Sequence, residues 1–252
     1  MKITVAVITF NEEKNIARCL KSVMGIADEI IVMDSGSSDN TENICREFGA
    51  TFYQQPWQGY AQQKNELNQR ATYPMILSLD ADEVLSPALQ ESILDLKNRY
   101  SEGVFSVNRL TNYCGTWIYH SGWYPDIKVR LFPKKCFWEG DLVHEELVYP
   151  SEMKAVLVAG HLEHYSYTSH RQHRERADRY SKLTAKKYVL SGRKPYLFQP
   201  LISAVGRFLK MYLIKRGFLD GAAGFHIARI SAISNYVKYQ EVKRLYDQRK
   251  AD

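Results

Sequence analysis

The sequence has few cysteines and no long apolar run, and each scarcity excludes a class of protein. Its 252 residues include four cysteines, and no two of them form a Cys-x-x-Cys pair. We therefore expect reduced thiols in a cytoplasmic protein, not a disulfide framework or a zinc site. Because no apolar run is long enough to span a bilayer and residues 1–5 lead directly into a strand, we expect neither a signal peptide nor a membrane-spanning helix.

The net charge of +6 hides a strong asymmetry along the chain. Residues 171–252 hold 19 of the 34 basic residues and 6 of the 28 acidic ones, a balance of +13. The rest of the chain holds 15 basic and 22 acidic residues, a balance of −7. A basic tail on an acidic body predicts an anionic partner for the tail, either nucleic acid or an anionic membrane surface.

Strand and helix patterns alternate over the first 80 residues. Apolar strands are expected at 3–8, 29–33, 51–54 and 75–79. Helices are expected between them: one capped by Asn11, one capped by Asp39 or Asn40 and ended by Gly49, and one over 60–71. This alternation predicts an α/β fold with a doubly wound, mostly parallel sheet and helices on both faces.

The pattern changes in the second half of the chain. Strands are expected at 103–109, 128–133 and 155–159, with an aromatic-rich loop over 113–124. From Ser169 the chain reads as helical, punctuated by Pro195 and Pro200 and by a turn at Gly217, Gly221 and Gly224. We therefore predict a catalytic domain over residues 1–168 and a helical, basic extension over 169–252.

The most informative motif is Asp80-Ala81-Asp82-Glu83, which directly follows the strand over 75–79. Two carboxylates at a strand end suit a hard divalent cation such as Mg²⁺ or Mn²⁺. Acidic pairs also cap helices, and Ser86-Pro87 is typical of a helix start. The context favours a ligand site, because the segments 8–13 and 32–39 bring polar residues to the same edge of the sheet, where ligands of open α/β sheets bind.

These three segments together resemble the inverting family 2 glycosyltransferases, which have the GT-A fold. The resemblance implies transfer of a sugar from a nucleotide-sugar donor with a divalent metal. The segments 122–126 and 215–221 further resemble bacterial glucosyltransferases that extend the lipopolysaccharide inner core.

The resemblance assigns donor-binding roles at the strand ends. It implies that Thr9, Asn11 and Glu12 contact the base and ribose, and that Asp34 accepts a hydrogen bond from the uracil ring N–H. It places Asp80 on the ribose side. The alternative for residues 11–13 is an N-cap followed by acids that favour the helix dipole, and for Asp39 a cap is favoured.

The resemblance also implies roles for residues near the diphosphate. Asp82 would bind the metal, and His164 would complete the metal shell. Lys64 would approach the donor, although a lysine on a helix is equally often solvated. Arg130 would face the diphosphate or pair with an acid.

An inverting transfer needs a general base for the acceptor hydroxyl. The best candidate segment is Val143-His144-Glu145-Glu146. Glu145 is the first choice, with Glu146 next and Asp126 third. The alternative is a surface strand end with two solvated acids.

The aromatic-rich loop and the tail offer two binding surfaces. Trp123, with Trp117, Tyr119 and Tyr124, would form a platform for sugar rings or a local core. Residues 201–213 place apolar side chains at helical spacing, with basic residues at Arg207, Lys210, Lys215 and Arg216. This amphipathic basic pattern predicts attachment to an anionic membrane.

The resulting hypothesis is a metal-dependent hexosyltransferase at the inner face of the cytoplasmic membrane. It would move glucose from a UDP-sugar to a lipopolysaccharide-core or other lipid-linked saccharide acceptor. Polyprenyl-phosphate and protein acceptors are alternatives. A nucleotidyltransferase is disfavoured, because the loop after its first strand is typically Gly-rich and basic and here reads Thr9-Phe10-Asn11-Glu12. A nucleic-acid-binding protein would leave the acidic body unexplained, so no nucleic-acid partner is expected.

Overall fold

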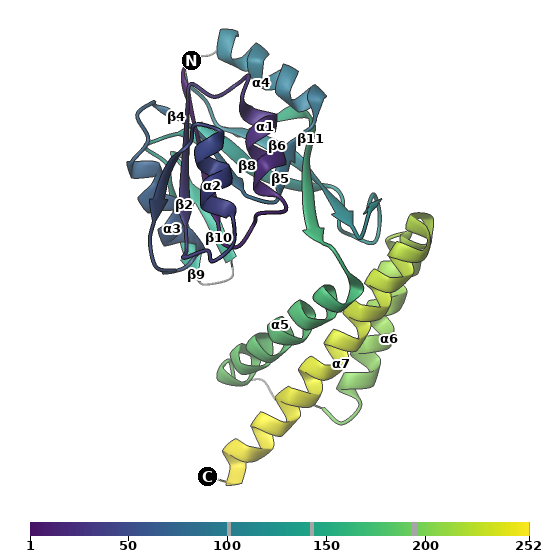
Figure 1. The fold of residues 1–252 in the computed structure, drawn as a ribbon. Helices are drawn as coiled ribbons and strands as arrows, with labels where there is room; N and C mark the ends of the chain where they lie inside the picture. Colours follow the sequence, from purple (N-terminus) through teal and green to yellow (C-terminus); the bar gives the residue numbers. More distant parts are fainter. Residues whose placement is uncertain (100–101, 142–143, 193–195, 252) are drawn as a thin grey trace. The chain divides into compact units, whose positions relative to one another are not determined.

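The computed structural model describes residues 1–99, 102–141, 144–192 and 196–251, and the chain forms two units (Figure 1). The first unit contains Met1–Leu110 and Asp126–Tyr165, and the second contains Thr111–Pro125 and Ser166–Asp252. The aromatic-rich segment 111–125 therefore groups with the C-terminal helices. Pro195, which was expected to interrupt the helical region, lies outside the described residues.

One mixed sheet is the centre of the first unit. Its parallel part has the order β3-β2-β1-β4, with β1 at Ile3–Thr9, β2 at Glu29–Asp34, β3 at Thr51–Gln54 and β4 at Met75–Asp80. The order continues through β8 (Asp126–Pro133), β6 (Phe105–Tyr113), β11 (Val156–Tyr167) and β5 (Glu83–Leu85), and the pairs β4–β8, β6–β8 and β5–β11 are antiparallel. A short strand, β7 (Thr116–Trp117), pairs with β6, while β9 (Phe137–Asp141) and β10 (His144–Val148) form a separate hairpin.

Helices cover both faces of this sheet, as the sequence predicts. The core on one face joins β1 to α1 (Ile16–Val23), α2 (Thr41–Glu47) and α4 (Pro87–Arg99). The core on the other face joins it to α3 (Tyr60–Gln69) and to the β9–β10 hairpin. Successive β1 side chains alternate between the two cores, which explains why the whole strand is buried and mostly apolar. The α/β class is therefore confirmed.

Several element boundaries differ from the sequence predictions. Helix α1 begins at Ile16, not after Asn11, because Asn11 adopts a left-handed backbone (φ 53°) that no helix continues. Asn40 precedes α2 without a side-chain cap, whereas Asp39 Oδ1 accepts a hydrogen bond from the Thr41 N–H at 3.1 Å. Strand β11 is much longer than the expected 155–159, and neither β5 nor the β9–β10 hairpin was predicted.

The second unit is mainly helical. It contains α5 (His170–Leu190), α6 (Gln199–Leu209), a π-helical turn η1 (Lys210–Ile214), a 3₁₀ turn η2 (Gly217–Asp220) and α7 (Gly221–Ala251). Helix α7 runs along both α5 and α6 (Figure 1). The Ser169 side chain caps α5 by accepting a hydrogen bond from Gln172 N. Gly224 lies within α7, so the predicted turn is limited to Gly217 and Gly221. Among the described helices, none has the length and apolarity needed to cross a bilayer.

Candidate active site

The carboxyl ends of β1, β2 and β4 lie next to one another. The strand register pairs Thr9 with Asp34 and Ile8 with Asp80. Three predicted site residues are thus brought to one edge by parallel pairing alone. This edge is where open α/β sheets bind ligands.

Asp34 organises the loop that follows β2. Its side chain is fully buried, and its Oδ2 accepts hydrogen bonds from Gly36 N at 2.8 Å and Ser37 N at 2.7 Å. The Ser37 hydroxyl donates to its other oxygen. Asn11 joins this loop to the β1 loop, because its Oδ1 accepts from Ser38 N at 2.8 Å and its N–H donates to Ser37 Oγ at 2.7 Å. The predicted uracil contact of Asp34 stays a prediction.

Thr9 and Glu12 occupy the loop after β1. The Thr9 hydroxyl is buried without a hydrogen-bond partner in the described part of the chain, which leaves it available to a ligand. The Glu12 carbonyl accepts from Asn15 N at 2.9 Å and from Ile16 N at 2.8 Å, and so begins α1. The backbone of Glu12 therefore has a structural role, while its predicted donor contact remains untested.

Lys64 is a buried charge that joins two acids. Its ammonium lies 3.1 Å from Asp80 Oδ1 and 3.0 Å from Glu145 Oε1, and its side chain is 1% exposed. It also lies 4.7 Å from the centre of the Trp138 ring. A buried ammonium needs such partners, because its desolvation is costly. The alternative of a solvated helix lysine is therefore wrong.

Arg130 pairs with two acids on the other side of Asp80. Its guanidinium lies 2.6 Å from Glu83 Oε1 and 3.2 Å from Asp80 Oδ2. Burial alone would raise the pKa of Asp80, but Lys64 and Arg130 outweigh it and hold that pKa below its usual range. Arg109 also lies 3.4 Å from the fully buried Glu83. Of the two roles considered for Arg130, pairing with an acid is the one the structure displays.

Asp82 and His164 form the candidate metal site. Asp82 Oδ2 lies 3.3 Å from His164 Nε2, because the β5–β11 register sets His164 opposite Glu83. Within the residues described, no group of three or more His, Cys, Asp or Glu side chains could hold an ion. One carboxylate and one imidazole would leave the other positions of a divalent ion open to further oxygen ligands.

The three candidate bases have different surroundings. Alternation along β10 sends Glu145 toward Lys64 and leaves Glu146 exposed, opposite Glu139 of β9. Asp126 is held by Arg109 at 2.7 Å and 2.9 Å. Burial raises the pKa of Asp126, but Arg109 and Lys128 lower it overall, which weakens this carboxylate as a base. Val143, also in the predicted segment, lies outside the described residues.

Trp123 lies in the second unit, where it packs in an aromatic cluster. Its ring centre is 5.7 Å from that of Tyr113, 5.8 Å from Tyr167 and 5.6 Å from His173. This arrangement favours the local core over the sugar platform for Trp123. Arg109 was not predicted to hold the site together, whereas Glu83 is part of the Asp80-Ala81-Asp82-Glu83 motif. No local pattern singled out Arg109, because the strand β6 also contains other polar residues.

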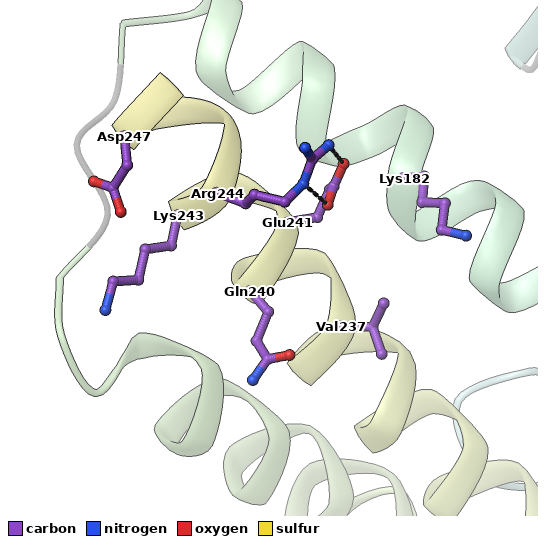
Figure 2. A pocket seen from close by; sticks show the side chains of 7 residues that line it. All are labelled: Lys182, Val237, Gln240, Glu241, Lys243, Arg244 and Asp247. Atoms are coloured by element: carbon purple, nitrogen blue, oxygen red, sulfur yellow. Dashed lines mark hydrogen bonds and ion pairs between the residues drawn. The ribbon is translucent and has the colours of Figure 1, made fainter. Parts of the chain in front are cut away.

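A separate hollow of about 430 Å³ lies on the second unit between α5 and α7 (Figure 2). Glu241 and Arg244 form a bidentate ion pair there, at 2.6 Å and 2.8 Å. Charges of both signs line the hollow, and no predicted site residue contributes to it. Its lining residues are Lys182, Val237, Gln240, Glu241, Lys243, Arg244 and Asp247.

The geometry described above defines an α/β protein whose predicted ligand site lies at the carboxyl ends of its parallel strands. The model of the glycosyl transferase family 2 matches residues 4–152, which is more than half of the chain. The chain therefore belongs to glycosyl transferase family 2, as the resemblance of its strand ends predicted. This match favours a glycosyltransferase over the nucleotidyltransferase alternative.

Similar proteins extend over nearly the whole chain. An uncharacterized glycosyltransferase of Rickettsia typhi is 31% identical and covers 97% of this chain and 87% of its own. The lipopolysaccharide core biosynthesis glycosyltransferase LpsC of Rhizobium meliloti is 28% identical over 90% of this chain and 86% of its own. Glucosyl-3-phosphoglycerate synthase from Mycobacterium tuberculosis, solved with Mn²⁺ and uridine diphosphate, is 22% identical with a TM-score of 0.37, and the match spans only 44% of either chain.

Proposed function

We propose that this glycosyltransferase moves a hexose, most simply glucose, from a UDP-sugar to a saccharide of the lipopolysaccharide-core type with inversion at the anomeric carbon. The observation that carries the proposal is the buried Lys64, which holds Asp80 of the donor edge and Glu145 together. The acceptor class is supported by the likeness to LpsC over most of both chains.

The donor would bind across the carboxyl ends of β1, β2 and β4. Thr9, Asn11, Glu12 and Asp34 would surround the uridine, with Asp80 on the ribose side. Asp82 and His164 would hold Mg²⁺ or Mn²⁺, which supplies charge neutralisation for the departing diphosphate. The His164 Nδ1 is buried without a hydrogen-bond partner among the described residues.

Glu145 would act as the base. Its carboxylate takes the proton of the acceptor hydroxyl while the hydroxyl oxygen bonds to the anomeric carbon. The bond from that carbon to the diphosphate oxygen breaks at the same time, and its electron pair leaves with uridine diphosphate. Glu145 remains 20% exposed, so an acceptor hydroxyl can reach it from solvent.

The second unit would hold the enzyme at the inner face of the cytoplasmic membrane. Helix α6 and the turn η1 expose a row of large apolar side chains, of which Ile214 is 74% exposed. Exposed basic side chains accompany it at Arg207, Lys210, Lys215 and Arg216. An apolar row beside basic groups suits the surface of an anionic leaflet, where each basic residue adds about 1 kcal/mol. The other exposed members of the row are Leu201, Ile202, Val205, Leu209 and Leu213.

The decisive experiment is a screen of nucleotide-sugars for slow hydrolysis and for thermal stabilisation of the protein, with and without Mn²⁺. UDP-glucose should give the largest effects, and only with metal. Asp82→Ala should lose the metal-dependent hydrolysis and keep its melting temperature, while the surface variant Asp95→Ala should match wild type. Full metal-dependent activity of Asp82→Ala would show that the metal site is elsewhere.

A further inference from the structure

The segment between β6 and β8 is fastened to the C-terminal helices by one carboxylate. The side chain of Asp220 is 2% exposed. Its oxygens accept hydrogen bonds from the backbone N–H groups of Tyr119 and His120, each at 3.1 Å, and from the hydroxyl of Ser121 at 3.0 Å. The imidazole Nδ1 of His120 lies 3.0 Å from the same carboxylate. Three consecutive residues are thus fixed by a side chain 100 positions away.

The turn that carries Asp220 packs closely against this segment. Ser121 N donates to the Lys215 carbonyl at 2.9 Å. A Cβ on Gly217 would lie 2.8 Å from Ser121 Oγ, and one on Gly224 would lie 1.8 Å from the Gly217 carbonyl oxygen. Ser121 itself has a left-handed backbone (φ 60°), which costs free energy that the surrounding contacts offset. Gly217 and Asp220 therefore contact residues 119–121 directly, while Gly224 lets α7 approach the turn closely.

Some large side chains in and next to this segment are buried, and others are exposed. Tyr113 and Ile118 are fully buried in the core of the second unit. Tyr119 is 47% exposed, and its ring meets that of the half-buried Tyr124 edge to face at 5.6 Å. The His120 side chain, next to Tyr119 in the sequence, is 33% exposed. The tyrosine pair offers an apolar face for sugar C–H groups, and the partly exposed imidazole of the neighbouring residue offers a polar group for sugar hydroxyls.

We propose that Tyr119, Tyr124 and His120 form a binding subsite for the saccharide acceptor, with Asp220 as the positioning residue that holds it in shape. The inference rests on the proposed function, because it takes the acceptor to be a saccharide. The segment is continuous in sequence with strands β6 and β8. The pairing of β6 with β8 ends at Arg109 and Asp126, and these two residues form an ion pair within the charge network around Asp80. Fixing the segment before the acceptor arrives reduces the entropy lost on binding.

Steady-state kinetics with UDP-glucose and a delipidated lipopolysaccharide core oligosaccharide test the subsite. Tyr119→Ala should raise the acceptor KM about tenfold, the equivalent of about 1.4 kcal/mol, and leave kcat and the donor KM unchanged. Asp220→Asn should raise the same KM and lower the melting temperature, because a buried acceptor of four hydrogen bonds is altered. Tyr180→Ala, which removes a tyrosine of similar exposure (46%) from α5, should match wild type.

A second measurement separates this proposal from the proposed function. Saturation-transfer NMR of the same oligosaccharide, without donor, should detect binding to wild type and to Tyr180→Ala and a loss of binding in Tyr119→Ala. Unchanged NMR binding and unchanged acceptor KM in Tyr119→Ala would overturn the subsite while leaving the transferase assignment intact. Absence of UDP-sugar hydrolysis with retained NMR binding would instead overturn the proposed donor and keep the subsite.

Discussion

The ammonium of Lys64 compensates two carboxylates that would otherwise repel each other. Asp80 and Glu145 both lie within 3.1 Å of it, and Arg130 adds a second positive charge to Asp80. Breaking a buried pair by removing one partner typically costs about 3–5 kcal/mol, because an uncompensated charge stays behind. Neutral isosteres therefore suit tests of these residues better than truncation does.

Glu145→Gln keeps the shape of the side chain and its contact with Lys64 but removes the ability to accept a proton. We expect donor binding to remain and the transfer rate to fall by about 100-fold or more. Calorimetry with UDP-glucose and single-turnover transfer measure the two quantities. Glu146→Gln, on the opposite face of β10, is the matched control and should transfer at the wild-type rate. An unchanged rate in Glu145→Gln would move the search to Asp126.

His173 makes the second unit sensitive to acid. Burial, with the nearby charges of His170 and Arg176, lowers its pKa from 6.5 to about 4, and its imidazole Nδ1 lies 3.0 Å from the buried Tyr113 hydroxyl. As the pH falls below 6.5 the unfolded chain binds a proton there and the folded chain does not. The free energy of unfolding therefore falls until about pH 4, and above pH 6.5 this group adds nothing.

The resulting prediction compares urea unfolding at pH 7 and pH 5. Between pH 7 and pH 5, the free energy of unfolding of wild type should fall by about 2 kcal/mol more than that of His173→Asn. The Asn amide replaces Nδ1 but does not titrate. The comparison isolates His173, because the carboxylates are common to both proteins. Equal falls in the free energy of unfolding would mean that His173 is protonated in the folded protein at pH 5.

Among the elements, β11 depends on a close approach to α4. Gly160 has φ +95°, and a Cβ there would lie 2.3 Å from the Leu89 backbone nitrogen. Gly160→Ala should lower the free energy of unfolding by about 3 kcal/mol, since it adds both backbone strain and overlap with a helix backbone. Denaturant unfolding measures the loss. Gly25→Ala, where no neighbouring atom lies within 4 Å, is the control and should change little.

The β9–β10 hairpin is far from Lys64 in the sequence but contributes two side chains that contact it. It contributes Glu145 and Trp138, which contact Lys64 from opposite strands. Asn65 of α3 fastens it, donating to the Trp138 carbonyl at 2.8 Å and accepting from Trp138 N at 2.7 Å. The helix that carries Lys64 thus also places its partner.

For the whole protein, the distribution of charge predicts binding to an anionic membrane surface. Replacing Arg207, Lys210, Lys215 and Arg216 with Gln should release it from anionic liposomes, and high salt should weaken wild-type binding without detergent. Sedimentation at low and high salt measures both effects. Transfer to a soluble oligosaccharide should persist, because the predicted donor site lies in the first unit. If wild type stays in the supernatant with anionic liposomes at low salt, the apolar row has another role, such as contact with a second copy.

Local patterns were sufficient to predict the parallel half of the fold and the strand ends that carry Thr9, Asp34 and Asp80. A buried strand, a turn and a helix are encoded over a few neighbouring residues, and parallel pairing then brings their carboxyl ends together. The family followed from the same segments. The start of α1 was predicted wrongly, because the left-handed Asn11 is held by Ser37 and Ser38 of another loop, which no local pattern reveals.

Only the tertiary structure decided which charges meet. Lys64 reaches Glu145 across 81 positions, and Asp220 reaches Tyr119 across 101. A lysine on a helix reads as solvated, and an aspartate between glycines reads as part of a turn, until the partner is known. Burial made these pairings necessary, because a charged group removed from water needs an opposite charge or hydrogen-bond donors close by. Which partner supplies them depends on how distant segments pack, and that information is not contained in any short stretch of the chain.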